Sequence, residues 1–186
     1  MIESLSCKYL PILYLEFTSR SNFLSTGRFY HGLGNVKASQ GLLEESFNFH
    51  RWARDHYRLT IGRQHHRTAD ANVRLADHFI RKNDIEGARY VEASLEFAAF
   101  LTSTFRELLS KAIQAYSDRG DIYYPEKSRA LYKRHKVQVM LGKFQDARCD
   151  AESSLQLHRQ ARPEDQRPFE SLKDEDFDST IVFWSR

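Results

Sequence analysis

Three six-residue stretches decide the fold that this sequence predicts: Gly41-Leu42-Leu43-Glu44-Glu45-Ser46, Asn83-Asp84-Ile85-Glu86-Gly87-Ala88 and Gly142-Lys143-Phe144-Gln145-Asp146-Ala147. Each begins with a turn-forming residue, has a bulky apolar residue two places later and an acidic residue close to it, and ends with a small residue. A helix-like sequence precedes each stretch and another follows it. This arrangement is typical of helix-turn-helix repeats that stack side by side, and such arrays mostly bind other proteins.

The composition is that of an ordinary globular chain, because 41% of the 186 residues are apolar and 28% are charged. The net charge is +3, but seven acidic and three basic residues give −4 from residue 163 onward, so the first 162 residues carry +7. This positive charge is too small and too scattered to indicate nucleic-acid binding. No segment is long and apolar enough to span a bilayer, and we expect a cytoplasmic protein without membrane contact.

The residue types that carry catalysis or bind metals do not form a recognisable site. Cys7 and Cys149 lack the spacing of metal ligands or of a disulfide scaffold. His65 and His66, with His56, suggest a metal site, but two adjacent histidines on a helix cannot both face one ion. Motifs for phosphate cradles and nucleophilic serines are missing from the sequence. We therefore expect no catalysis, no metal and no cofactor.

Between residues 27 and 162, apolar residues recur with a helical period, which predicts three helix pairs. The expected breaks between helices are Gly41, Gly62, Asn83–Asp84 and Gly142. Thr68 is expected to cap the third helix, and Pro125 is expected in the first turn of a later one. The sequence thus predicts an all-α fold.

The two ends of the chain differ from this array. Residues 1–26 have no helical period and stay unassigned. Residues 163–186 begin with an acidic linker bounded by prolines, and Ser171–Asp174 resembles a capping signal. Phe177, Ile181 and Trp184 then predict an amphipathic helix that caps the stack, with the acids of 174–176 complementing its N-terminal dipole.

The helix pairs resemble the tetratricopeptide repeat, which favours bulky, leucine, small, glycine and alanine residues at fixed positions. The first unit has Tyr30, Leu33, Gly34, Gly41 and Ser46 at these positions; the second has Leu75, Ala76, Asn83 and Ala88; the third has Leu131, Arg134, His135, Gly142 and Ala147. Arg134 and His135 depart from the pattern. The 42-residue spacing is similar to that of kinesin light chains and MalT-type regulators, and to the C-terminal arrays of fungal proteins that join NB-ARC or NACHT modules to such repeats. The resemblance implies an α-α superhelix in which small residues lie where paired helices cross.

One interval does not match the repeat. Ser46, Ala88 and Ala147 are separated by 42 and 59 residues, and removing residues 90–105 would reduce the second interval to 43. We therefore interpret residues 90–105 as an insertion, for which a retained intron is one source, and residues 1–26 as a second product of the same kind. The alternative is one long helix from Ile85 to about Ser117.

The resemblance also implies which side chains face a partner, because the first helix of each pair lines the concave surface. The implied peptide-binding residues are Arg28, His31, Asn35, Asp77, Arg81, Arg129, Tyr132, Lys133 and Lys136, and the same helix positions include Ser39 and Val73. Co-chaperone repeats bind a terminal carboxylate at related positions. Asn35, Arg129 and Lys133 match that clamp, whereas His31 and Arg74 replace its lysine and asparagine.

The expected function is non-catalytic protein binding, as a scaffold or as the sensor part of a larger protein. The alternative is a co-chaperone-like module that recognises an acidic segment or a C-terminal carboxylate. An enzyme of unrecognised type is the third class. The outer side of the first repeat is either exposed, covered by residues 1–26, or covered by another chain, and self-association through this edge is one expected outcome.

Overall fold

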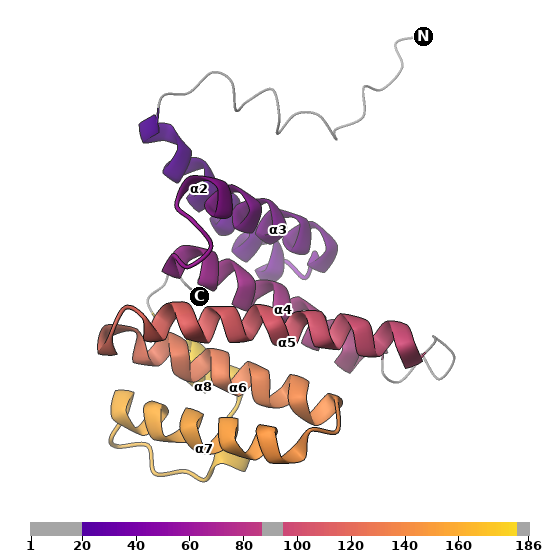
Figure 1. Ribbon diagram of the computed structural model, residues 1–186, viewed down its shortest axis with the longest axis vertical. Helices are drawn as coiled ribbons and strands as arrows, with labels where there is room; N and C mark the ends of the chain where they lie inside the picture. The colour runs from indigo at the N-terminus through magenta and orange to yellow at the C-terminus, as the bar shows by residue number, and fades with distance from the viewer. Residues whose placement is uncertain (1–19, 87–94, 182–186) are drawn as a thin grey trace.

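The computed structural model describes residues 20–86 and 95–181, and within these ranges all regular structure is helical (Figure 1). The α-helices are α2 (Arg20–Ser39), α3 (Leu43–Thr60), α4 (His66–Glu86), α5 (Leu95–Ser117), α6 (Tyr124–Met140), α7 (Phe144–Ala161) and α8 (Asp174–Asp178). Two 3₁₀ turns, η1 (Asp121–Tyr123) and η2 (Phe169–Ser171), precede α6 and α8. The all-α prediction is confirmed for this part of the chain, and none of its helices is long and apolar enough to cross a membrane.

Two of the predicted breaks between helices, at Gly41 and Gly142, have the same pattern of backbone hydrogen bonds. Gly41 and Gly142 have φ angles of 75° and 69°, a conformation that glycine adopts without a steric penalty. After each glycine, a backbone N–H donates to a carbonyl five residues earlier: Leu42 to Lys37 at 3.0 Å, and Lys143 to Gln138 at 2.9 Å. These are Schellman-type helix ends. The chain therefore closes α2 and α6 in the same way, as the sequence predicts.

The predicted turn at Asn83–Asp84 is wrong, because α4 continues through both residues to Glu86. Neither residue is a glycine, and no non-glycine residue in the described ranges has a positive φ. A helix that lacks a left-handed residue at this point has no local reason to stop. Ala88, the small residue of this stretch, lies outside the described residues.

The other helix boundaries bring further corrections. Helix α2 begins at Arg20, inside the range left unassigned, and α4 begins at His66, so Thr68 is not its cap. The Thr68 hydroxyl instead donates to the carbonyl of Gly62 at 2.8 Å. The prediction for Pro125 is confirmed, because it lies in the first turn of α6.

At the C-terminal end, Lys173 precedes α8 and donates its backbone N–H to the carboxylate of Asp176 at 2.7 Å. The helix start is therefore two residues later than the predicted signal at Ser171, which closes η2. Helix α8 has only five residues, although Phe177 and Ile181 are both buried as predicted. Trp184 lies outside the described residues.

Helices α4 and α5 are antiparallel neighbours, so the single helix from Ile85 to Ser117 is not formed (Figure 1). At one end the rings of Phe79 and Phe105 stack with centroids 4.5 Å apart. At the other end the Tyr116 hydroxyl donates to Asp70 at 2.8 Å. Residues 95–105 belong to α5 and are continuous with the rest of that helix. Whether 90–105 is an insertion stays a prediction.

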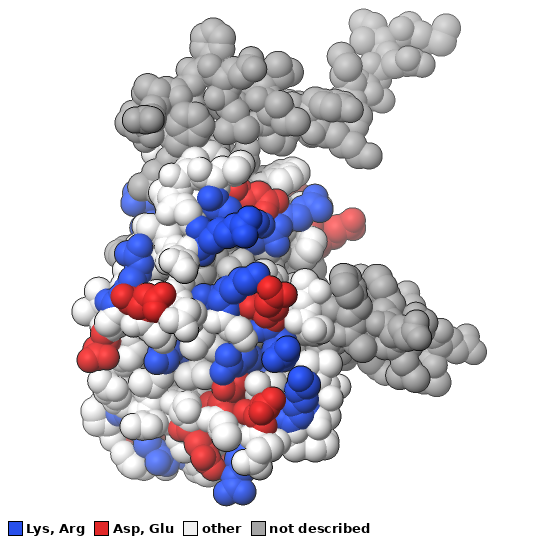
Figure 2. All heavy atoms as spheres, in the orientation of Figure 1, with Lys and Arg blue, Asp and Glu red and all other residues white. Residues whose placement is uncertain are grey.

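Consecutive helices from α2 to α7 pack against one another, and α4 also contacts α6. The side of the stack formed by α2, α4 and α6 is called a layer below. The main core lies between α4, α5 and α6, and its fully buried members are small or aliphatic residues such as Ala76, Ile80, Leu109, Ala112 and Val137. On the face in Figure 2, basic and acidic side chains lie beside one another.

Paired helices approach closely where the sequence places small residues. In the first pair, Ser46 is fully buried and its hydroxyl donates to the carbonyl of Gly34 at 2.6 Å. In the third pair the position equivalent to Gly34 is His135, whose Nδ1 lies 2.9 Å from the carbonyl oxygen of Ala147. The departure from the repeat pattern at His135 is therefore accommodated by a hydrogen bond across the same crossing.

Candidate functional site

The candidate site lies on α6, where three cations share one helix face. Arg129, Lys133 and Lys136 are four and three residues apart, a spacing that places their side chains along one side of a helix. The acidic C-terminal segment occupies this face. Asp174 lies 2.7 Å from Nζ of Lys133 and 3.0 Å from Nζ of Lys136, and Asp178 lies 3.4 Å from Nε of Arg129.

Lys133 is the centre of these ion pairs, with a side chain that is 1% exposed. Its ammonium group also donates to Asp77 on α4 at 2.6 Å. Asp77 has two further cationic neighbours, Arg81 at 3.2 Å and Arg74 at 3.7 Å. Burial acts to raise the pKa of Asp77, but these three cations outweigh it and hold the pKa below its ordinary value. Asp77 therefore stays ionised and balances the buried Lys133.

An aromatic contact anchors the C-terminal segment between its carboxylates. The ring of Phe177 is fully buried and stacks on Tyr132 with centroids 4.2 Å apart. The Tyr132 hydroxyl donates to the carbonyl of Leu172 at 3.3 Å, and Nζ of Lys136 lies 5.1 Å from the Tyr132 ring centroid. Phe177 also contacts the ring of His158 on α7. The segment is thus bound through two buried apolar side chains, Phe177 and Leu172, and through two carboxylates.

A second cluster of the predicted site residues lies at α2. Arg28, His31 and Asn35 line a pocket of about 710 Å³, together with Tyr57 and Arg67 from α3 and α4. His31 is 4% exposed, and neither of its ring nitrogens has a hydrogen-bond partner. Burial, followed by the positive charges of Arg74, Arg129 and Arg67, lowers the pKa of His31 to about 3. The ring is therefore neutral near pH 7.

Next to His31, histidines from three helices meet, of which His31 and His50 are buried and His78 is half-buried. Nδ1 of His50 on α3 lies 2.9 Å from Nε2 of His78 on α4, and Nε2 of His50 lies 3.1 Å from Oδ1 of Asn35. The His31 and His50 rings have centroids 5.2 Å apart. Burial is the first cause that lowers the pKa values of His50 and His78, the latter to about 4. Two neutral rings satisfy these contacts if His50 donates to Asn35 and His78 donates to His50.

The nine implied peptide-binding residues therefore form two groups. Arg28, His31 and Asn35 lie at the α2 pocket, whereas the remaining six gather around Lys133: Asp77, Arg81, Arg129, Tyr132, Lys133 and Lys136. Val73 is buried in the main core and faces no groove, and Ser39 is exposed at the end of α2.

Sequence reasoning missed two features of the site. The first is the occupant: the acids of 174–176 are interpreted above as helix N-terminal charges, yet Asp174 pairs with α6. The opposite net charges of the two parts of the chain are the signal that could have revealed it. The second is the cluster of His50 and His78, two histidines from different helices that no sequence motif brings together. The rings of His65 and His66 stack on each other with centroids 4.2 Å apart.

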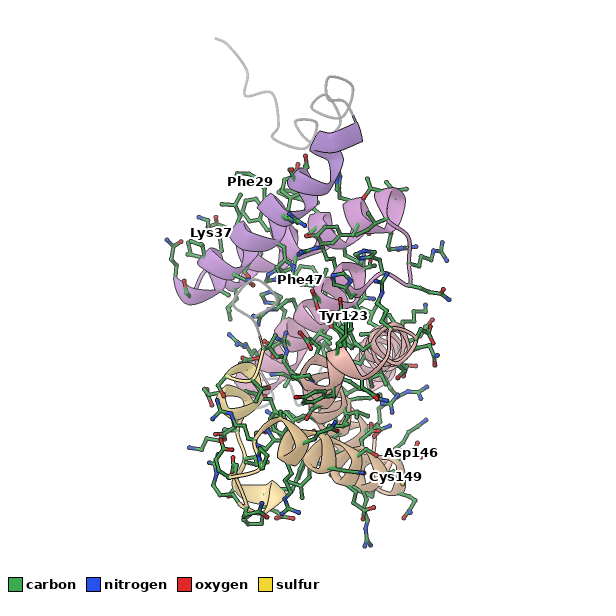
Figure 3. All side chains as sticks on the ribbon, turned by 90° about the vertical axis from the view of Figure 1, so that its left-hand side faces the viewer. Phe29, Lys37, Phe47, Tyr123, Asp146 and Cys149 are labelled. Carbon is green, nitrogen blue, oxygen red and sulfur yellow. The ribbon has the colours of Figure 1, made fainter. Side chains whose placement is uncertain are left out.

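The outer edge of α2, which also lines the pocket of Arg28 and His31, carries exposed apolar residues. Phe29 and Val36 are 62% and 51% exposed, and a side chain at Gly32 between them would meet no atom within 4 Å. Figure 3 shows Phe29 pointing away from the helix stack. This edge is where the sequence predicts self-association, which stays a prediction.

Comparisons of the chain with family models, curated proteins and solved structures find no match, so the likeness to tetratricopeptide repeats rests on the residues quoted above.

Proposed function

We propose that this chain is a non-catalytic protein-binding module, whose layer of α2, α4 and α6 accepts an acidic polypeptide segment. The observation that carries the proposal is the chain's own C-terminal segment on that layer. Asp174 of this segment forms ion pairs with Lys133 and Lys136, and the ring of Phe177 stacks on that of Tyr132. A surface that already holds an acidic peptide within the molecule has the chemistry to hold one from another protein.

The part of the layer nearest α2 supports the same proposal. The α2 pocket is lined by Arg28 and Arg67, and neither forms an ion pair with a described carboxylate. Arg81, one turn beyond Asp77, is 43% exposed. Cations on the rim of a groove favour association with a negatively charged partner and steer its approach. A scaffold, or the sensor part of a larger protein, would use such a groove.

The alternative, a co-chaperone-like binder of terminal carboxylates, has one observation in its favour. Arg129 and Lys133, two members of the predicted clamp, both lie within ion-pair distance of side-chain carboxylates in the chain. The third member, Asn35, is engaged by His50 at 3.1 Å. Asn35 accepts this bond through Oδ1, so the contact does not use the amide N–H groups that would donate to a terminal carboxylate.

A peptide selection followed by site-specific cross-linking tests the proposal. The full chain is used to select from a displayed random peptide library, and we expect acidic sequences to be enriched. A photoreactive residue in place of Arg81 should then cross-link the selected peptide. The same residue in place of Arg148 on α7, which is 75% exposed, should not. Failure to enrich any sequence, or cross-linking only from position 148, would reject the proposed function.

A further inference from the structure

The C-terminal segment matches α6 in both spacing and direction. Asp174 pairs near the C-terminal end of the cationic face and Asp178 pairs with Arg129 at its N-terminal end, so α8 runs antiparallel to α6. Arg129 and Lys133 are one helical turn apart, as are Asp174 and Asp178, and four residues of helix span about 6 Å. Phe177 and Tyr132 meet between the two charged contacts.

The remaining contacts of this segment are both buried and exposed: Leu172 and Ile181 are 5% and 2% exposed, and Asp165 lies 3.0 Å from Nε2 of the buried His158 on α7. Pro163 and Pro168 bound an exposed linker, and Arg167 pairs with Asp165 at 2.8 Å and Asp176 at 2.6 Å on its outer side. The Arg167 side chain is 48% exposed, and exposed pairs of this kind contribute little stability. The attachment therefore combines the buried side chains of Leu172, Phe177 and Ile181 with the carboxylates of Asp174 and Asp178.

We propose that residues 172–178 are an internal competitor for the α6 site, and that the partner presents the same arrangement. The partner segment would have a carboxylate, an aromatic residue three positions later and a second carboxylate one position after that, all within one helical turn. This inference rests on the proposed function and specifies the partner of that site as a segment of another protein. The partner binds by displacing the C-terminal segment.

Competition inside one chain has a measurable consequence. A short linker holds the segment at an effective concentration of the order of millimolar, so a free peptide of equal intrinsic affinity competes poorly with it. Weakening the internal segment while leaving α6 intact should therefore increase the affinity for added peptide. The probe is a fluorescent synthetic peptide of residues 168–181, measured by anisotropy with the full-length chain.

The opened variant combines Asp174→Lys and Asp178→Lys, which replace attraction to α6 by repulsion. The matched control combines Glu170→Lys and Glu175→Lys, which make the same charge change at exposed residues that form no ion pair with a described residue. We expect the opened variant to bind the probe at least about tenfold more tightly than the parent and the control. A probe with alanine at the Phe177 position should bind none of them.

Three outcomes would overturn the inference. The opened variant could keep the parent's circular dichroism and still not bind the probe, or it could bind a scrambled probe equally well. If the double variant does not fold, Asp178→Asn removes only the longest ion pair, and no increase in probe affinity with this variant would also contradict the inference. A concentration-dependent dimer of the parent that the opened variant does not form would instead assign the site to a second copy of the chain. The peptide selection above does not use this probe, so its success would leave the proposed function intact.

Discussion

Lys133 donates to Asp77 across 2.6 Å and so joins α6 to α4 inside the protein, with both side chains at most 6% exposed. The same ammonium group holds Asp174 at 2.7 Å. One buried cation thereby links the stability of the helix stack to the attachment of the C-terminal segment.

Replacing Lys133 should therefore destabilise the protein strongly. Lys133→Met leaves Asp77 buried with fewer compensating charges, and breaking a buried pair in this way costs about 3–5 kcal/mol. Urea denaturation followed by circular dichroism measures the loss. Lys111→Met is the control, because its pair with Glu107 is 60–65% exposed and should contribute less than about 1 kcal/mol. An equal decrease in the free energy of unfolding in the two variants would show that the buried Lys133–Asp77 pair stabilises the protein no more than an exposed pair does.

Two glycines on α2 should respond oppositely to alanine. A Cβ at Gly34 would lie 2.4 Å from the ring of His50, whereas one at Gly32 would meet nothing within 4 Å. We expect Gly34→Ala to destabilise the protein by about 1–3 kcal/mol through overpacking. Gly32→Ala should stabilise it by up to about 1 kcal/mol through helix propensity. Thermal unfolding of both variants measures these changes in stability. A destabilised Gly32→Ala variant would contradict the finding that Gly32 has free space around it.

Mild acid should loosen the helix pair formed by α2 and α3. Burial lowers the pKa values of His31 and His78 to about 3 and 4, so these histidines are neutral when folded but take up protons below pH 6.5 when unfolded. The low pKa values therefore leave the free energy of unfolding unchanged above pH 6.5. Below pH 6.5 the free energy of unfolding falls progressively, by about 2 kcal/mol for each of the two histidines at pH 5. Asp77, whose pKa is lowered instead, loses its contribution only below its unfolded pKa near 4.

Denaturation at pH 7.5 and pH 5 measures this effect, and hydrogen exchange locates it. The His31→Leu variant removes one of the groups and should lose less stability between the two pH values than the parent. An identical pH dependence in the two proteins would mean that His31 does not titrate as its burial implies.

Truncating the aromatic anchor should release the C-terminal segment without unfolding the stack. Phe177→Ala removes a fully buried ring, a change that costs about 3–5 kcal/mol in a protein core. Because α8 contacts mainly α6, we expect faster proteolysis between residues 162 and 173 with little change in helicity. Phe144→Ala, at a ring that is 69% exposed, should leave the cleavage rate unchanged. Protection equal to that of the parent would show that the ion pairs and the other buried residues, Leu172 and Ile181, hold the segment without the Phe177 ring.

The helices and most of their ends could be predicted because local chemistry determines them. Gly41 and Gly142 end helices through backbone conformation alone, and the apolar period of the intervening sequence needs no tertiary information. Asn and Asp occur at many turns, but Asn83 and Asp84 do not stop α4, which continues to Glu86. The start of α2 at Arg20 was missed because the first turns of that helix lack an amphipathic pattern.

For the candidate site, the sequence predicts which residues of α6 lie together but not which residues they contact. Helical spacing alone places Arg129, Tyr132, Lys133 and Lys136 together on α6. What they contact depends on a segment about 40 residues away in sequence, and no local pattern specifies that pairing. His50 was missed because its burial depends on the absence of a side chain at Gly34, a relationship between two helices.

The antiparallel pairing of α8 with α6 also determines how binding should respond to ionic strength. A partner that displaces α8 exchanges one set of carboxylates for another, so the number of ion pairs on α6 is the same before and after. Screening by salt then weakens both states alike, and the exchange on the parent chain should be nearly independent of salt concentration. Capture of the same partner by a chain with α8 detached forms new ion pairs and should weaken as salt is added.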